Sequence, residues 1–119
     1  MAEALDCGND HVTANNVAKV WGAMTGGTGT VSMKDSFNVD SVTDNGSGDY
    51  SFSFSSVLGN ANYSVVVSSQ QSGSGGTSAN HIDIDRDVAP AAGSIRFNNG
   101  DSGTNIDVDE VYFVVYGDE

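Results

Sequence analysis

Residues 36–67 read SFNVDSVTDNGSGDYSFSFSSVLGNANYSVVV, and this stretch decides the fold class. Residues 49–55 alternate between aromatic and small polar side chains, which places Tyr50, Phe52 and Phe54 on one face of a strand. The preceding loop, residues 43–48, supplies asparagine, aspartate and glycine, which tolerate a positive φ. The stretch therefore predicts a β-hairpin that turns an aromatic row towards the core.

The rest of the chain extends the same pattern. Of 119 residues, 38% are hydrophobic, only two are leucine and one is proline, while valine, serine, glycine and aspartate are abundant. That composition disfavours helices and favours short strands joined by polar turns. We predict eight strands, at residues 17–23, 28–35, 37–43, 50–55, 63–69, 80–86, 94–98 and 105–117.

Eight short strands at regular spacing predict an all-β fold, an antiparallel β-sandwich of jelly-roll type. Residues 17–119 form this single domain, and residues 1–16, which have no apolar face, are expected to be an extended N-terminal arm. The core is expected to form where Trp21 and Phe37 meet the aromatic row of residues 50–54. Ile82 and Ile84 are expected to point inward in the same way.

The last predicted strand has two apolar faces. Val111, Phe113 and Val115 alternate with Tyr112, Val114 and Tyr116, so each face of this strand needs a cover. The protein's own core covers one face, and either a neighbouring subunit or a long loop of the same chain covers the other. We predict an oligomer interface that involves Val111, Tyr112, Val114 and Tyr116.

Charge and targeting signals limit the possible partners. Sixteen acidic residues against four basic ones give a net charge of -12, which repels nucleic acid and anionic membranes, so neither is expected as a partner. Cys7 is the only cysteine, so an internal disulfide is excluded. No apolar run approaches the roughly 18 residues that span a membrane, and no secretion signal is visible.

One acidic segment is a candidate metal site. His81, Asp83, Asp85 and Asp87 alternate along a predicted strand and would share one face, with Arg86 on the other. Oxygen ligands in this number suit a hard cation such as calcium. A solvated acidic strand face has the same sequence pattern, so both interpretations stay open.

The sequence offers no catalytic residues. The glycine-rich segments lack the lysine of a phosphate-binding loop, and no Gly-x-Ser-x-Gly elbow joins a strand to a helix. Asp107 and Asp109 could in principle serve glycoside hydrolysis, but nothing distinguishes them from the other carboxylates. We expect a protein that is not an enzyme and needs no cofactor.

Four separate pieces of the chain resemble, in order and spacing, a module of bacteriophage virion proteins. They are Ala-Lys-Val-Trp at residues 18–21, Gly-Thr-Gly-Thr-Val at 27–31, Ser-Phe-Asn-Val at 36–39 and Thr-Asp-Asn-Gly-Ser-Gly-Asp-Tyr at 43–50. The module is similar to the C-terminal β-domain of phage tail-fibre proteins. The resemblance covers roughly the first half of the chain and its last strand.

The resemblance implies a structural protein of the virion, assembled in the host cytoplasm. Because the module stands here without a fibre shaft, we expect a homotrimeric capsid decoration, or cement, protein that binds the major capsid protein or other virion proteins. The alternative is a tail-fibre tip or receptor-binding protein that contacts the host surface. A carbohydrate-binding module is a third and more distant interpretation.

Overall fold

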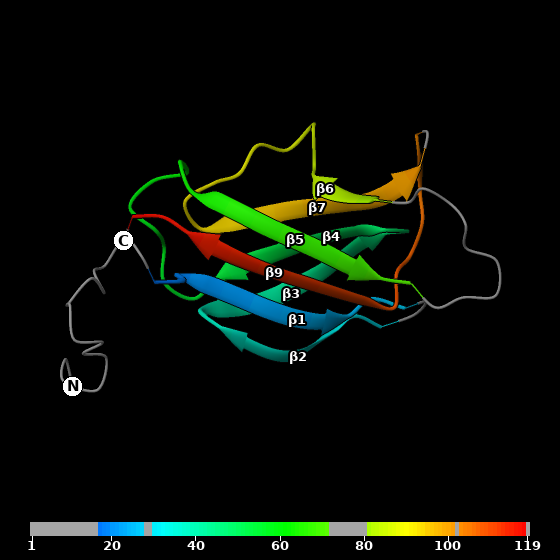
Figure 1. Ribbon diagram of the computed structural model, residues 1–119, viewed down its shortest axis with the longest axis horizontal. Helices are drawn as coiled ribbons and strands as arrows, with labels where there is room; N and C mark the ends of the chain where they lie inside the picture. The colour runs from blue at the N-terminus through cyan, green and yellow to red at the C-terminus, as the bar shows by residue number, and fades with distance from the viewer. Residues whose placement is uncertain (1–16, 28–29, 72–80, 102, 119) are drawn as a thin grey trace, which may run out of the picture.

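The computed structural model describes residues 17–27, 30–71, 81–101 and 103–118, which contain nine strands in two antiparallel sheets (Figure 1). These residues include no helix, and hence none that could cross a membrane. The all-β prediction is confirmed. The jelly-roll order of the strands stays a prediction, and the predicted arm lies outside the described residues.

The first sheet, sheet A, has four strands. Their spatial order is β2 (Ser32–Phe37), β1 (Val20–Thr25), β9 (Glu110–Tyr116) and β5 (Ser64–Gln70). Strand β9 therefore lies in the middle of the sheet, paired with β1 on one side and β5 on the other. One face of β9, with Val111, Phe113 and Val115, points into the core, and the other, with Tyr112, Val114 and Tyr116, points outward.

The second sheet, sheet B, lies behind sheet A in Figure 1. Its spatial order is β3 (Val39–Gly46), β4 (Asp49–Phe54), β7 (Ser94–Asp101) and β6 (His81–Ile84), and the short β8 (Thr104–Asn105) pairs with β7. The predicted final strand, residues 105–117, is thus two strands in different sheets. Its first residue, Asn105, pairs with β7, residues 106–109 form no strand, and only residues 110–116 enter sheet A.

The core fills the space between the two sheets. Tyr50, Phe52 and Phe54 are buried, as the alternation in β4 predicts. The ring of Phe52 packs against Phe113 of sheet A at a centroid distance of 4.6 Å and against Phe97 at 5.7 Å. The buried hydrophobic residues are Val20, Met24, Tyr50, Phe52, Phe54, Leu58, Ile82, Ile95, Phe97, Val108, Val111, Phe113 and Val115.

The prediction that Trp21 and Phe37 join this core is wrong. Trp21 is 37% exposed and Phe37 is 54% exposed. In β1 the inward face instead carries Val20 and Met24, with Gly22 between them. A Cβ on Gly22 would stand 2.8 Å from the Phe113 ring, so the missing side chain makes room for that ring. The core therefore takes its aromatic group on this side from β9 rather than from β1.

The predicted strand 37–43 is interrupted at Asn38. Asn38 has a φ of 59° and stands between β2 of sheet A and β3 of sheet B. Its side-chain amide donates to the carbonyl oxygens of Lys19 and Ser56, and its side-chain oxygen accepts from the Ser56 N–H at 2.6 Å. Asparagine tolerates this left-handed conformation better than most residues. The residue lets the chain pass from one sheet to the other.

Candidate functional site

The predicted acidic face of residues 81–87 does not form. Strand β6 ends at Ile84. The side chain of Ile84 is 39% exposed, so the prediction that it points inward is wrong, and the side chain of the next residue, Asp85, is buried. Asp85 is only 6% exposed, and its Oδ1 accepts hydrogen bonds from the backbone N–H groups of Asp87 and Val88. Asp85 therefore caps the turn after β6, and the alternation that would align the four side chains stops at this residue.

Asp85 also takes part in an ion-pair network on sheet B. Arg96 of β7 donates from Nε to Asp49 Oδ1 at 2.7 Å, and its Nε lies 3.3 Å from Asp85 Oδ2. The hydrogen bond that Arg96 donates to Asp49 raises the pKa of the Arg96 guanidinium, and the charges of Asp49 and Asp85 add to this effect. The network joins three segments of the sheet, β4, β7 and the turn after β6, so its role is structural.

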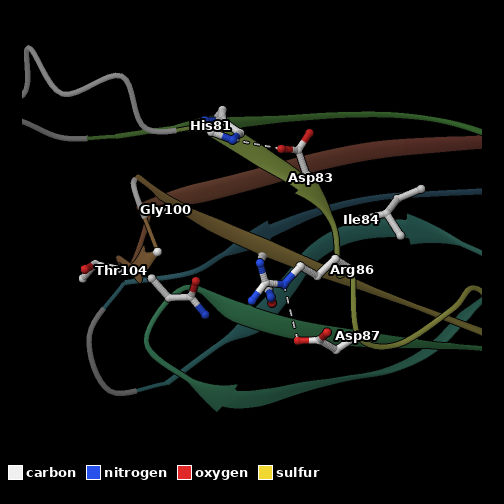
Figure 2. A pocket seen from close by; sticks show the side chains of 10 residues that line it. His81, Asp83, Ile84, Arg86, Asp87, Gly100 and Thr104 are labelled. Carbon is white, nitrogen blue, oxygen red and sulfur yellow. Dashed lines mark ion pairs between the residues drawn. The ribbon is translucent and has the colours of Figure 1, made fainter.

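The remaining residues of this segment line a polar hollow at the end of sheet B (Figure 2). The hollow has a volume of about 520 Å³. Its lining residues come from β6, the turn after it, β7 and the β7–β8 turn, and they are His81, Asp83, Ile84, Arg86, Asp87, Asn98, Gly100, Gly103, Thr104 and Asn105.

Strand pairing explains how these residues meet. Asp83 lies opposite Asn98, and both point outward because their neighbours Ile82 and Phe97 are buried in the core. Gly100 permits the tight approach of β8, because a Cβ there would stand 2.2 Å from the Thr104 carbonyl oxygen. Cross-strand register therefore brings together groups that the sequence separates by about twenty residues.

Two ion pairs lie within the polar hollow. His81 Nε2 is 3.0 Å from Asp83 Oδ2, and Arg86 Nε is 3.6 Å from Asp87 Oδ2. In Figure 2 the Arg86 side chain extends towards the side of Gly100 and Thr104. The prediction that Arg86 lies away from the carboxylates is wrong, because the strand ends before it and the turn reverses the alternation. In the part of the chain that the structure describes, no three acidic, histidine or cysteine groups come together as metal ligands.

The outward face of sheet A carries a second candidate surface. Strand pairing places Phe37 opposite Trp21, Trp21 opposite Val114, and Val114 opposite Val66. These four residues, here called the outer row, cross all four strands of the sheet. Val66 is 65% exposed, and Val114 is half-buried between its neighbours. An exposed apolar row across a sheet is a candidate contact surface.

Three of the four residues predicted at an oligomer interface lie on this face. Tyr112, Val114 and Tyr116 point outward from β9, whereas Val111 is fully buried in the core, so its assignment to an interface is wrong. The hydroxyl group of Tyr112 contacts the carboxylate of Glu110, which also pairs with Lys34 at 2.7 Å. The interface itself stays a prediction.

A smaller pocket lies beside the outer row. It has a volume of about 450 Å³, shares Phe37 with the row, and is lined by Lys19, Phe37, Asn38, Ser56, Val57 and Leu58. Val57 on its rim is 67% exposed. The Asn38 side chain, which lines this pocket, is held by hydrogen bonds to Lys19 and Ser56.

Sequence reasoning missed most of both surfaces. Asn98, Thr104 and Asn105 look like ordinary turn residues, and no local pattern connects them with Asp83. Trp21 and Phe37 were assigned to the core because large aromatic side chains usually lie there. The glycine at position 22 was the one available signal, since an inward glycine next to an outward tryptophan marks the close approach of another group.

Comparisons with known proteins found no matching family model, curated protein or solved structure. The phage resemblance therefore depends on the four sequence motifs alone. Function has to be argued from the two surfaces and from those motifs.

Proposed function

We propose that this chain is a non-enzymatic structural protein of a bacteriophage virion, a homotrimeric capsid decoration protein that stabilises the head shell. The observation that carries the proposal is the outer row, which crosses every strand of sheet A and contains no charged residue. The four phage-like motifs supply the virion context. Jelly-roll topology belongs to the proposal and is supported by the pairing of β1 with the last strand, β9.

The distribution of charge favours contact between copies through this face. The four strands of sheet A contain one basic residue, Lys34, and two acidic residues, Asp35 and Glu110, a net charge of -1 in a chain of net charge -12. Two copies of an acidic protein repel each other least where the carboxylates are fewest. Sheet A is therefore the face through which identical copies can approach and bury apolar surface.

The test of this assembly is the molar mass in solution. We expect light scattering at micromolar concentration to give about three times the 12.3 kDa chain mass. Val66→Asp should give monomers, because burying a carboxylate without a partner costs several kcal/mol. Ser53→Asp is the matched control, because it adds the same charge to the exposed side of β4 in sheet B and should leave the trimer intact.

A monomeric wild-type protein would contradict the trimer. A Val66→Asp variant that stays trimeric would show that the outer row is not part of the trimer interface. Ser53→Asp should keep the wild-type unfolding transition, whereas Val66→Asp should fold but lose the stability that assembly adds.

Binding to the shell is a separate measurement. Heads prepared without the protein should bind it, and a variant that lacks residues 2–16 should fold normally but bind less, because an arm without a core face can order on the shell. Three arms per trimer would multiply each weak contact. If the trimer does not bind such heads, the decoration role is wrong and the fibre-tip alternative takes its place.

A further inference from the structure

The polar hollow has the size and rigidity of a small-molecule site. Its volume of about 520 Å³ falls within the range of roughly 300–1,000 Å³ that is typical of ligand sites. Three of its sides are held in place, β6 and β7 by strand pairing and β8 by the tight turn at Gly100. Asp85 and Arg96 fix the turn that carries the fourth side. The backbone around the hollow is therefore set before any ligand arrives, while the side chains of Asp83, Arg86 and Asp87 extend from it into solvent.

Its charges disfavour an ionic ligand. A cation would meet the Arg86 guanidinium, and no three of the described acidic, histidine or cysteine side chains lie close enough together to hold it. An anion would meet those two carboxylates. Arg86 Nε lies 3.6 Å from Asp87 Oδ2 and His81 Nε2 lies 3.0 Å from Asp83 Oδ2, so each carboxylate of the hollow already has a neighbouring nitrogen. A neutral ligand is the one that these groups do not repel.

The hydrogen-bonding groups select the chemistry of that neutral ligand. Carboxylates accept, the Arg86 guanidinium donates, and the side chains of Asn98, Asn105 and Thr104 can do both. Asn98 Oδ1 is itself buried, so a ligand in the hollow does not reach this oxygen and meets the other polar groups. A ligand with several hydroxyl groups, each a donor and an acceptor, matches this set.

We propose that the polar hollow binds a neutral sugar, one hexose unit of a glycan. Asp83 and Asp87 accept from neighbouring hydroxyl groups, Arg86 donates to a ring or hydroxyl oxygen, and Thr104 and Asn105 supply further donors and acceptors. This activity goes beyond the proposed structural role. The hollow lies on sheet B and the outer row on sheet A, so sugar binding and trimer assembly can succeed or fail independently.

The direct experiment is a titration of the ¹⁵N-labelled full chain followed by amide chemical shifts. The probes are the methyl glycosides of glucose, galactose and mannose, up to about 50 mM, because one shallow subsite gives an affinity in the millimolar range. At least one glycoside should cause saturable shifts at Asp83, Thr104 and Asn105. Calcium chloride and inorganic phosphate, added separately, should not produce them.

Paired variants identify the site. Asp83→Ala should weaken binding of that glycoside at least about tenfold, the loss expected when a charge-assisted hydrogen bond worth 1.4 kcal/mol or more is removed. Asp40→Ala is the control, because Asp40 is also an exposed aspartate of sheet B but lies on β3, outside the hollow. The amide spectrum of each free variant reports whether it is folded, and both exposed positions should tolerate alanine.

Three results would overturn the proposal. They are the absence of saturable shifts with all three glycosides, equal affinity of the Asp83→Ala variant, and saturable shifts at the hollow with calcium or phosphate in place of the sugars. The last result would assign the hollow to an ion. The molar mass of the protein does not enter any of these outcomes, so a failed trimer test leaves them unaffected.

Discussion

Two apolar rows cross this molecule, one inside and one outside. The inner row, Tyr50, Phe52 and Phe54, runs along β4 and is buried between the sheets. The outer row, Phe37, Trp21, Val114 and Val66, runs across the strands of sheet A and stays partly exposed. Alternation along a strand determines which side chains share a face. It does not determine which face is covered, because that depends on what packs against the sheet.

The difference has an energetic meaning. An inner-row side chain contributes to the stability of each single chain, since its contacts form whenever the chain folds. An outer-row side chain contributes little to the folding of one chain and gains contacts only when a partner covers it. Substitutions in the two rows should therefore affect different measurements.

The largest effect is expected in the inner row. Phe52→Ala removes a ring packed against Phe97 and Phe113 and should lower the free energy of unfolding by about 3–5 kcal/mol. Phe37→Ala, at an exposed site, should lower it by less than about 1 kcal/mol. Chemical denaturation of both variants in the monomeric Val66→Asp background separates folding from association. Equal losses for Phe52 and Phe37 would mean that the two rows do not differ in this way.

A smaller loss is expected from the buried hydroxyl group of the inner row. Tyr50 Oη donates to the Gly26 carbonyl oxygen at 2.9 Å and accepts from the Val108 N–H at 3.3 Å, so it joins two loops at one end of the molecule. Tyr50→Phe leaves both backbone groups without this partner and should cost about 1–3 kcal/mol. Tyr116→Phe, which alters an exposed hydroxyl group on sheet A, is the control in the monomeric Val66→Asp background and should leave the unfolding transition unchanged there.

The smallest effect appears only at alkaline pH. Burial raises the pKa of both Tyr50 and Tyr63 from 10.0 to about 12, so the folded protein keeps these phenols protonated when the unfolded chain begins to lose its protons. The folded state then binds more protons than the unfolded state, and stability should fall as pH rises from about 10 to about 12. Denaturation midpoints measured across this interval test the direction.

The Tyr50→Phe variant should show a shallower decline over the same pH interval, because one of the two shifted groups is gone. A stability that stays flat up to pH 12 would contradict the burial of these phenols.

The parts of the fold that local sequence encodes were predicted well. The alternation in β4 correctly predicted the inner row. The two apolar faces of residues 111–116 correctly predicted that Tyr112, Val114 and Tyr116 lie on the face opposite the buried side chains of β9. These predictions held because the period of two is a property of the strand itself. Predicted strand ends were less accurate, as Asn38 and Asp85 show. At both positions a polar side chain ends or redirects the strand through hydrogen bonds that local alternation cannot reveal.

The sequence by itself determined the fold class, the inner row and the acidic character of the surface, because composition and alternation are properties of the chain alone. Only the tertiary structure decided that Trp21 faces outward, that Asp85 leaves the acidic segment, and that Asp83 meets Asn98 across two strands. Each of those outcomes depends on strand register and on a packing partner elsewhere in the chain. The Phe113 ring is such a partner: it packs over Gly22 on the inward face of β1. Trp21 therefore lies on the opposite, outward face of that strand.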